Sequence, residues 1–142
     1  MVVLVTGSRE IRPGSPAEAV VRRYIHDAII GRMKMNGSLQ HITLVHGACP
    51  RGADQIAEDY SSLVGRVKRF EAHWKRLGPV AGPQRNKRMV DFVEKAMKEG
   101  QDAICLAFPA LDHKSRGTRG CLGMAMNAGI PFGGQGVMVH EP

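Results

Sequence analysis

The stretch "VVLVTG", residues 2–7, is an unbroken apolar run rich in β-branched residues that ends in a glycine. A strand with one wet face alternates apolar and polar residues, whereas a strand covered on both faces is apolar throughout. The run therefore predicts a buried parallel strand. The same pattern recurs at "ITLVHG" (42–47) and at "AICLAFP" (103–109), which predicts two more strands of the same kind.

Three further stretches extend this pattern less strongly. The more polar "RVKRFEA" (66–72) predicts a strand near an edge of the sheet, and "IPF" (130–132) begins a fifth strand. The segment "GVMVH" (136–140) either extends the sheet or forms a tail.

Between the strands, apolar residues recur at helical spacing. Ser15, Pro16 and Glu18 have the residue types of an N-cap and the first turn of a helix.

The helical patterns have ends that the sequence marks. Gly37 and Gly100 follow the first and third patterns, as glycine does after many helices. "RLGPVAGPQRN" (76–86) is predicted as a loop in which the third helix starts at Gly82-Pro83. "HKSRGTRG" (113–120) is predicted as a loop that opens into the fourth helix. The predicted helices are 16–36, 53–64, 82–99 and the segment from that loop to about residue 129.

Strands and helices thus alternate along the whole chain. Alternation of this kind predicts a single α/β domain with a mostly parallel sheet of five to six strands and helices on both faces. The domain covers residues 1–142, with a core over about 2–132 and a C-terminal strand or tail over 133–142. Ligands of such sheets bind at the carboxyl ends of the strands, so the loops after strands are the place to look for a site.

Composition limits the classes of function. The chain has 142 residues, a net charge of +7 and three cysteines without C-x-x-C spacing, which predicts a reducing compartment, by default the cytoplasm. The N-terminus does not have the pattern of a signal peptide, and no apolar run is long enough to predict a membrane partner. Eight basic residues against Glu71 in the stretch 66–88 suit an anionic ligand, a nucleic acid or simply a solvated surface.

Three loops after predicted strands share one chemistry. They are "TGSR" (6–9), "HGACPRGAD" (46–54) and "SRGTRG" (115–120), and all combine glycine with arginine or a hydroxyl. Glycine lets the backbone approach a ligand, and unpaired N–H groups at a helix start attract anions. Neither G-x-G-x-x-G nor G-x-x-x-x-G-K-[ST] occurs, so the usual dinucleotide and P-loop motifs are absent. The loops predict a ligand that carries phosphate, although they could also be tight turns.

Other chemistries fit the sequence less well. His46 and Cys49 with His113 or Cys121 lack the paired spacing of a zinc site, so we expect no metal, and nothing predicts another cofactor. A Cys49 nucleophile would need a base such as His46. Asp54 suits a helix start as well as a ribose hydroxyl.

Two residues of the stretch 66–88 are candidates for ligand contact because of their side-chain chemistry. Arg85 is expected in the first turn of the third helix, where it would oppose the helix dipole unless an anion binds. Trp74 could stack on a base or simply pack against its neighbours. The sequence alone leaves both alternatives open.

The motifs "VTGSRE", "VHGACPRGAD", "HWKRLGPVAGPQRNKRM" and "SRGTRG…AGIPF" occur in an order that resembles the SLOG superfamily, and within it the YspA-type, YpsA-related branch. The resemblance covers about residues 2–132. It implies a Rossmann-like domain that binds a nucleotide or an ADP-ribose-like ligand, as a sensor or processing protein of a phage or mobile element, and a possible homodimer. The ligand-binding residues that it implies are Gly7, Ser8, Arg9, Gly47, Gly52, Ala53, Asp54, Arg85, Asn86, Met89, Gly117 and Thr118.

One position departs from the related LOG-type phosphoribohydrolases, whose motif is P-G-G-x-G-T-x-x-E. Gly117 and Thr118 keep the Gly-Thr pair, but Cys121 replaces the catalytic Glu, and a thiol cannot take over that carboxylate's role unaided. An N-glycosidic hydrolase acting on nucleoside monophosphates stays an alternative that would need Asp54, or else Asp112, as the catalytic group in place of that Glu. A single-stranded nucleic-acid binder is a further one, against which the scarcity of aromatic residues counts.

Overall fold

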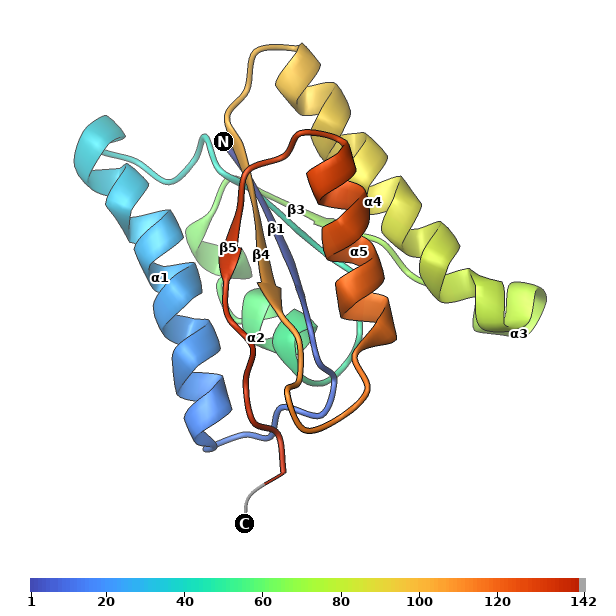
Figure 1. Ribbon diagram of the computed structural model, residues 1–142. Coiled ribbons are helices and arrows are strands. Elements are labelled where there is room, and N and C mark those ends of the chain that lie inside the picture. The colour runs from blue at the N-terminus through green and yellow to red at the C-terminus, as the bar shows by residue number, and fades with distance from the viewer. Residues whose placement is uncertain (141–142) are drawn as a thin grey trace.

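The computed structural model describes residues 1–140, and the side chains of all of these except residues 32–36. Its centre is a five-stranded sheet in the order β3-β2-β1-β4-β5, in which every neighbouring pair is parallel (Figure 1). The strands are β1 (Val2–Gly7), β2 (Thr43–His46), β3 (Arg66–Arg69), β4 (Ala103–Phe108) and β5 (Phe132–Gly134). The predicted α/β, Rossmann-like fold with a parallel sheet is confirmed.

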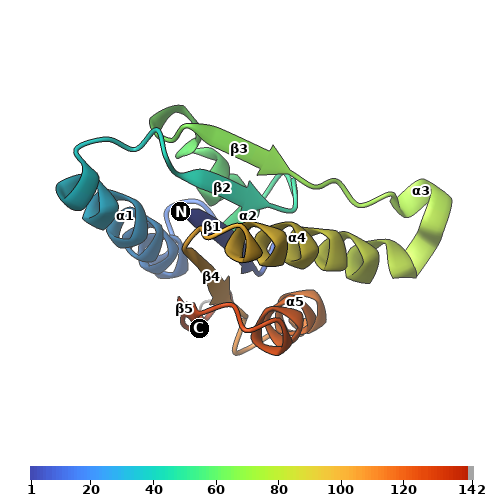
Figure 2. The same cartoon turned by 90° about the horizontal axis from the view of Figure 1, so that it is seen from above.

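Helices cover both faces of the sheet, as predicted (Figure 2). One face packs against α1 (Pro16–Asn36) and α2 (Ala53–Glu58), and the other against α4 (Ala81–Lys98) and α5 (Arg116–Asn127). A short helix α3 (Trp74–Leu77) and a 3₁₀ turn (Gly78–Val80) precede α4, and a second 3₁₀ turn (Ser61–Leu63) follows α2. Within residues 1–140, no helix is both long and apolar enough to cross a membrane.

The apolar run of β1 fills both layers of the core. Val3 and Val5 belong to the layer beneath α1 and α2, whereas Val2 and Leu4 belong to the layer beneath α4 and α5. All four side chains are buried. Alternate residues of a strand point to opposite faces, so a strand covered on both sides must be apolar at every position. The apolar run 2–7 therefore indicates a central strand with a layer of helices on each face of the sheet.

The start of α1 follows the sequence signals closely. The backbone N–H of Glu18 donates to Oγ of Ser15 at 3.2 Å, which is the bond of an N-cap residue. The Glu18 carboxylate accepts in return from the N–H of Gly14 at 3.2 Å. The two bonds form a variant of the capping box that reaches one residue further back.

The predicted helix over 53–64 is too long. The helix α2 ends at Glu58, and a 3₁₀ turn then brings the chain to Val64, which is extended. The N–H of Gly65 donates to the carbonyl oxygens of Leu39 and Ile42, so the chain has already joined the sheet there. The apolar residues of this stretch keep helical spacing although the backbone turns early to reach β3.

The predicted loop over 76–86 is also wrong, because most of it is helical. The helix α4 begins at Ala81, two residues before Pro83. Arg85 therefore lies in the second turn of α4, and the expected conflict with the helix dipole in a first turn does not arise. Likewise α5 begins at Arg116, so Gly117 and Thr118 are in its first turn rather than in the loop before it.

The C-terminal segment is joined to the sheet by a single bridge. Ala110 pairs with Val137 in parallel, and β5 itself begins at Phe132. The Asp112 carboxylate accepts from the N–H groups of Val139 at 2.9 Å and His140 at 2.8 Å. The segment therefore extends the sheet rather than hanging free, and residues 141–142 of the predicted strand or tail lie outside the described residues.

Candidate functional site

A cleft opens where the strand order reverses direction. The chain runs outward from β1 to β2 and β3 and then returns to β4 on the other side of β1. Such a switch point leaves a crevice at the carboxyl ends of the two central strands. The cleft there has a volume of about 680 Å³. Ten of the twelve predicted ligand-binding residues line it: Gly7, Ser8, Arg9, Gly47, Asp54, Arg85, Asn86, Met89, Gly117 and Thr118.

Gly52 and Ala53 lie behind the cleft rather than in its wall. Gly52 has a φ of 74°, and a Cβ built on it would collide with the backbone of Ser8 and Arg9. The N–H of Ala53 donates to the carbonyl oxygen of Ser8 at 3.2 Å, and a Cβ at Gly7 would lie 2.6 Å from that of Ala53. Their expected role in ligand binding is therefore not supported by position. They seat α2 against the loop after β1.

The loop after β1 forms one wall of the cleft. The Ser8 side chain is buried, and its Oγ accepts the N–H of Glu10 at 3.0 Å. The N–H of Ser8 donates to the carbonyl oxygen of Phe108 at the end of β4, at 3.1 Å. These bonds fix the loop at the switch point. The guanidinium of Arg9 extends from it into solvent.

The start of α5 forms the opposite wall. Ser115 is the residue before the helix, and its Oγ accepts the N–H of Ala110 at 2.7 Å instead of capping the helix. Gly117 is exposed, with nothing within 4 Å of a Cβ built on it, and the side chain of Thr118 is buried. Ser115 thus makes no side-chain cap bond to this 12-residue helix. Ser115, Arg116, Gly117 and Thr118 all line the cleft, so the helix start, with its N–H groups and the positive end of its dipole, is placed where an anion could bind.

Hydrogen bonds across the floor join the residue after β2 to the start of α5. Arg85 donates from Nη1 to the carbonyl oxygen of Gly47 at 2.6 Å and from Nε to Oδ1 of Asn86 at 2.9 Å. Asn86 in turn donates from Nδ2 to the carbonyl oxygen of Gly117 at 3.0 Å. The end of β2 is thus connected to the start of α5 through two side chains of α4.

Asp54 is a buried carboxyl in the same floor. Its side chain accepts the N–H of Cys49 at 3.2 Å, and a Cβ on Gly47 would lie 3.0 Å from its Oδ2. Burial raises the pKa of Asp54 above its usual range, and the Cys49 N–H and the nearby His46 and Arg85 offset only part of this effect. A buried carboxyl of this kind can accept a hydrogen bond from a hydroxyl or take part in proton transfer.

His46 is bonded at both ring nitrogens. Its Nδ1 accepts the N–H of Ala48 at 3.0 Å, so the proton of the neutral ring is on Nε2, which lies 2.9 Å from Oε1 of Glu58. The Glu58 carboxylate also accepts two bonds from Arg69, at 2.6 Å and 2.7 Å. Neither nitrogen is free to activate the thiol of Cys49. His46 therefore does not supply the base that the nucleophile hypothesis for Cys49 would need.

Cys121 lies below the floor and not in the cleft. It is fully buried, and burial raises the pKa of its thiol to about 11, against opposing effects of Thr6 and Arg85. The residue that the resemblance to LOG-type enzymes aligns with a catalytic Glu is thus a buried thiol outside the cleft lining. No three His, Cys, Asp or Glu side chains within the described part of the chain lie close enough to hold a metal ion.

Charged side chains lie at the outer edge of the cleft, its rim, and the sequence motifs contained only some of them. Arg9, Arg51 and Arg116 line the cleft, as does Lys114, which no motif pointed to. Glu71 and Trp74 line it as well, on the side of β3. No local pattern could find Lys114 and Glu71, because they come from loops that meet only in the fold. Their position after predicted strands was the one available signal.

The basic stretch 66–88 does not form one surface. Arg69 pairs with Glu58, Lys87 pairs with Asp91 at 3.0 Å, and Arg85 is in the floor of the cleft. Arg66, Lys68 and Arg88 lie over the rings of Phe70 and Phe92 at 5.5–6.0 Å, and Lys75 and Arg76 belong to α3. Binding of single-stranded nucleic acid stays a prediction that this distribution of charge does not favour.

Comparisons with known proteins identify a relative among phage proteins. No known protein-family profile matches the chain, and no solved structure matches it. The Gene 61 protein of Mycobacterium phage D29 is 34% identical over 137 residues, which cover 91% of this chain and 91% of that protein. Identity at this level over nearly the full length of both chains shows common descent. The chain therefore belongs to the same family as the Gene 61 protein of Mycobacterium phage D29.

Proposed function

We propose that the cleft binds a nucleotide or a nucleotide-derived ligand of the ADP-ribose type. The observation that carries the proposal is the uncapped start of α5 facing the loop after β1 across a switch-point cleft of about 680 Å³. A volume of this size is typical of small-molecule sites. Helix starts at switch points bind phosphate in many α/β proteins. The resemblance to the SLOG superfamily supports the same ligand class.

The parts of such a ligand have natural positions. Its phosphate lies at the first turn of α5, near Gly117 and Thr118, with Arg9 and Arg116 as charge partners on the rim. Asp54 accepts a bond from a ribose hydroxyl in the floor of the cleft. Arg85 supplies positive charge there while its own hydrogen bonds hold it in place. Sensing or processing of such a compound, in a protein related to a phage protein, follows as the wider proposal.

Ligand-induced stabilisation tests this function. The purified protein is heated with inorganic phosphate, ribose 5-phosphate, nucleoside mono- and diphosphates, and ADP-ribose. A compound that binds raises the free energy of unfolding by about 2.7 kcal/mol at a hundred times its Kd. The proposal is wrong if none of the phosphorylated compounds raises the Tm. Titration calorimetry then gives the Kd of any compound that does.

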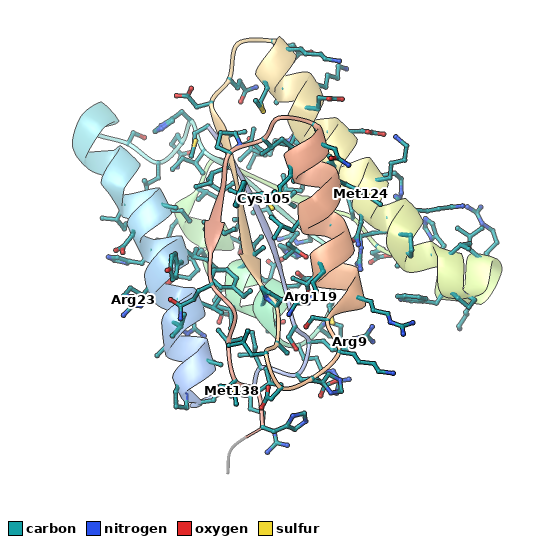
Figure 3. The ribbon with its side chains drawn as sticks, viewed as in Figure 1. Arg9, Arg23, Cys105, Arg119, Met124 and Met138 are labelled. Atoms are coloured by element: carbon teal, nitrogen blue, oxygen red, sulfur yellow. The ribbon has the colours of Figure 1, made fainter. Side chains whose placement is uncertain are left out.

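Exposed arginines provide matched variants for this test. Arg116→Gln and Arg9→Gln remove charge at the rim, and each should weaken binding about tenfold, as loss of a charge-assisted hydrogen bond does. Arg23→Gln is the control, because Arg23 is exposed on α1, far from the start of α5 near which Arg9 lies (Figure 3). Equal weakening by Arg23→Gln would show that only overall charge matters and would contradict a site at the start of α5.

Hydrolysis of an N-glycosidic bond is a second candidate, favoured by one observation. Asp54 is a buried carboxyl with a raised pKa that lines the cleft, which suits a group that takes a proton from water as water attacks the anomeric carbon. The bond between the anomeric carbon and the base breaks, the base leaves with a proton from the solvent, and Asp54 returns its own proton to the solvent. The candidate predicts free base and ribose 5-phosphate from a nucleoside monophosphate, and loss of this release in Asp54→Asn. Binding without turnover across purine and pyrimidine monophosphates would leave only the first function.

A further inference from the structure

Trp74 is the one tryptophan of the chain, and it is placed unusually for so large an apolar ring. It begins α3, the short helix that projects beyond the sheet in both views of the fold (Figures 1 and 2). It lines the cleft, and 48% of its surface is exposed to solvent. Among the ring–ring and cation–ring contacts of the described residues, none involves Trp74. An apolar ring exposed in a cleft points to a binding role.

The indole is held in place rather than free to turn. Its six-membered ring packs on Gly82 in the first turn of α4, where a built Cβ would lie 3.0 Å from Cη2 and 3.7 Å from Cζ2. Gly82 is buried by this contact and its neighbours. Any other residue at position 82 would push the indole outward. The missing side chain at Gly82 therefore gives the indole room to pack against α4, with part of the ring left open toward the cleft.

The segment before Trp74 is fixed as well and lines the same end of the cleft. Glu71 and Ala72 follow β3 and are both in the lining. Arg88 donates from Nη2 to the carbonyl oxygen of Glu71 at 2.6 Å, which ties this segment to α4. β3 and β4 are separated by β2 and β1 in the sheet, a distance of about 14 Å at the usual strand spacing. The Trp74 end and the α5 end can therefore hold different parts of one ligand.

We propose that Trp74 and Glu71 form the base subsite of this cleft: the indole stacks on the heterocyclic base of a nucleotide whose phosphate lies at the start of α5. This inference rests on the proposed function and adds the orientation of the ligand. Every base has a π-face that stacks on an aromatic ring. The Glu71 carboxylate accepts hydrogen bonds and donates none, so it favours bases that carry an amino group.

The single tryptophan makes the subsite directly observable. Its fluorescence is recorded while the wild-type protein is titrated with adenosine, cytidine and uridine monophosphates, and with ribose 5-phosphate as the ligand without a base. Stacking quenches the emission, so the nucleotides should lower it in proportion to occupancy. Ribose 5-phosphate should raise the Tm without changing the emission. Glu71→Gln should weaken adenosine and cytidine monophosphate binding more than that of uridine monophosphate.

Variants at position 74 separate stacking from a merely structural role. Trp74→Phe keeps a ring and should retain most of the affinity, whereas Trp74→Leu keeps apolar bulk and should lose about 5- to 100-fold in nucleotide affinity. Val80→Ala is the matched control, an exposed apolar residue of the same connection outside the cleft lining. It should leave nucleotide binding unchanged.

The possible failures are distinguishable. If nucleotides raise the Tm but leave the emission unchanged, and Trp74→Leu binds them like the wild type, the base lies elsewhere and only the proposed function stands. If Trp74→Leu and Trp74→Phe weaken nucleotides and ribose 5-phosphate equally, Trp74 supports the fold of the site, and the subsite is wrong. If no phosphorylated compound binds, both the function and the subsite fail.

Discussion

Asp54 combines a structural cost with a position in the cleft. The carboxyl is buried, and its main compensation is one backbone N–H and the nearby charge of Arg85. Stability alone would not select a group that is costly to ionise at this place. Residues that lower stability in a cleft are common where a ligand or a reaction needs them. The carboxyl is therefore the single residue whose chemistry most deserves measurement.

The pH dependence of stability checks the state of Asp54. Because its folded pKa is raised, the unfolded chain loses this proton first, and the folded state loses stability as the pH rises from about 4 through the folded pKa. Asp54→Asn removes this loss. We expect the variant to gain stability relative to the wild type as the pH rises above about 4, by about 1.4 kcal/mol per unit of pKa shift. Urea unfolding at a series of pH values measures the difference.

Glu58 is a control whose pKa is shifted in the opposite direction from that of Asp54. Its hydrogen bonds to Arg69 and His46 lower the pKa from 4.5 to about 2. The stability that it contributes is full above pH 4.5 and is lost as the pH falls toward 2. The wild type should therefore lose stability relative to Glu58→Gln on acidification, by about 1 kcal/mol because Arg69 is half exposed to water. A difference between wild type and Asp54→Asn that ran in the same direction would mean that the pKa of Asp54 is lowered.

At the scale of elements, the contact between the loop after β1 and the start of α2 decides the shape of one cleft wall. Gly52 is essential to it for two separate reasons, a positive φ and the close approach of the Ser8 backbone. The sequence could show that a glycine was present after β2. It could not show that the backbone of Gly52 faces another loop, whereas that of Gly47 faces the cleft. Only the packing of α2 on β1 distinguishes the two glycines.

Two alanine substitutions separate the effect of the positive φ from the effect of the close backbone contact. Gly14 also has a positive φ, of 78°, but nothing lies within 4 Å of a Cβ built on it. Gly14→Ala should therefore cost about 1 kcal/mol, the strain of φ alone. Gly52→Ala should cost about 2–4 kcal/mol, because the loop must also move. Thermal unfolding of the two variants gives the comparison, and equal losses would mean that the β1 loop yields without cost.

The connection from β3 to α4 is the element that the sequence predicted worst. Gly78, Pro79, Gly82 and Pro83 are typical of a loop, yet they stand in a 3₁₀ turn and in the first turn of α4. Proline is tolerated in the first turn of a helix, where its missing N–H has no partner to lose. The error mattered, because the helical turns at 74–80 were missed, and with them the contact of Trp74 with Gly82.

At the scale of the whole molecule, the alternation of apolar runs and helical patterns was enough to predict the sheet. The strand end at Gly7 and the helix start at Gly117 were predicted as neighbours because parallel strands end at one edge. Lys114 and Glu71 were not predicted, since Lys114 stands just before the motif "SRGTRG" and Glu71 was placed inside the predicted strand 66–72. Asn86 was expected to contact a ligand, and its bond to Gly117 across the floor could be known only from the packing of α4 on α5.

The burial of the cysteines is a whole-molecule property with a direct readout. Cys105 and Cys121 are fully buried, and burial raises the pKa values of their thiols to about 12 and about 11. Cys49 is partly exposed in the cleft. A thiol reagent at pH 7.5 should therefore label one thiol quickly in the folded protein and all three in urea. Fast labelling of Cys121 without urea would show that the domain opens locally around the floor.

The hydrogen bonds from Gly47 through Arg85 and Asn86 to Gly117 have a thermodynamic consequence. Because the end of β2 and the start of α5 are joined before any ligand arrives, the entropy of ordering them is lost once, during folding. Association then needs little rearrangement, which is the condition called preorganisation. The floor can stay constant while rim residues change. Related chains could therefore acquire different ligands through loop residues alone, without rebuilding the centre of the domain.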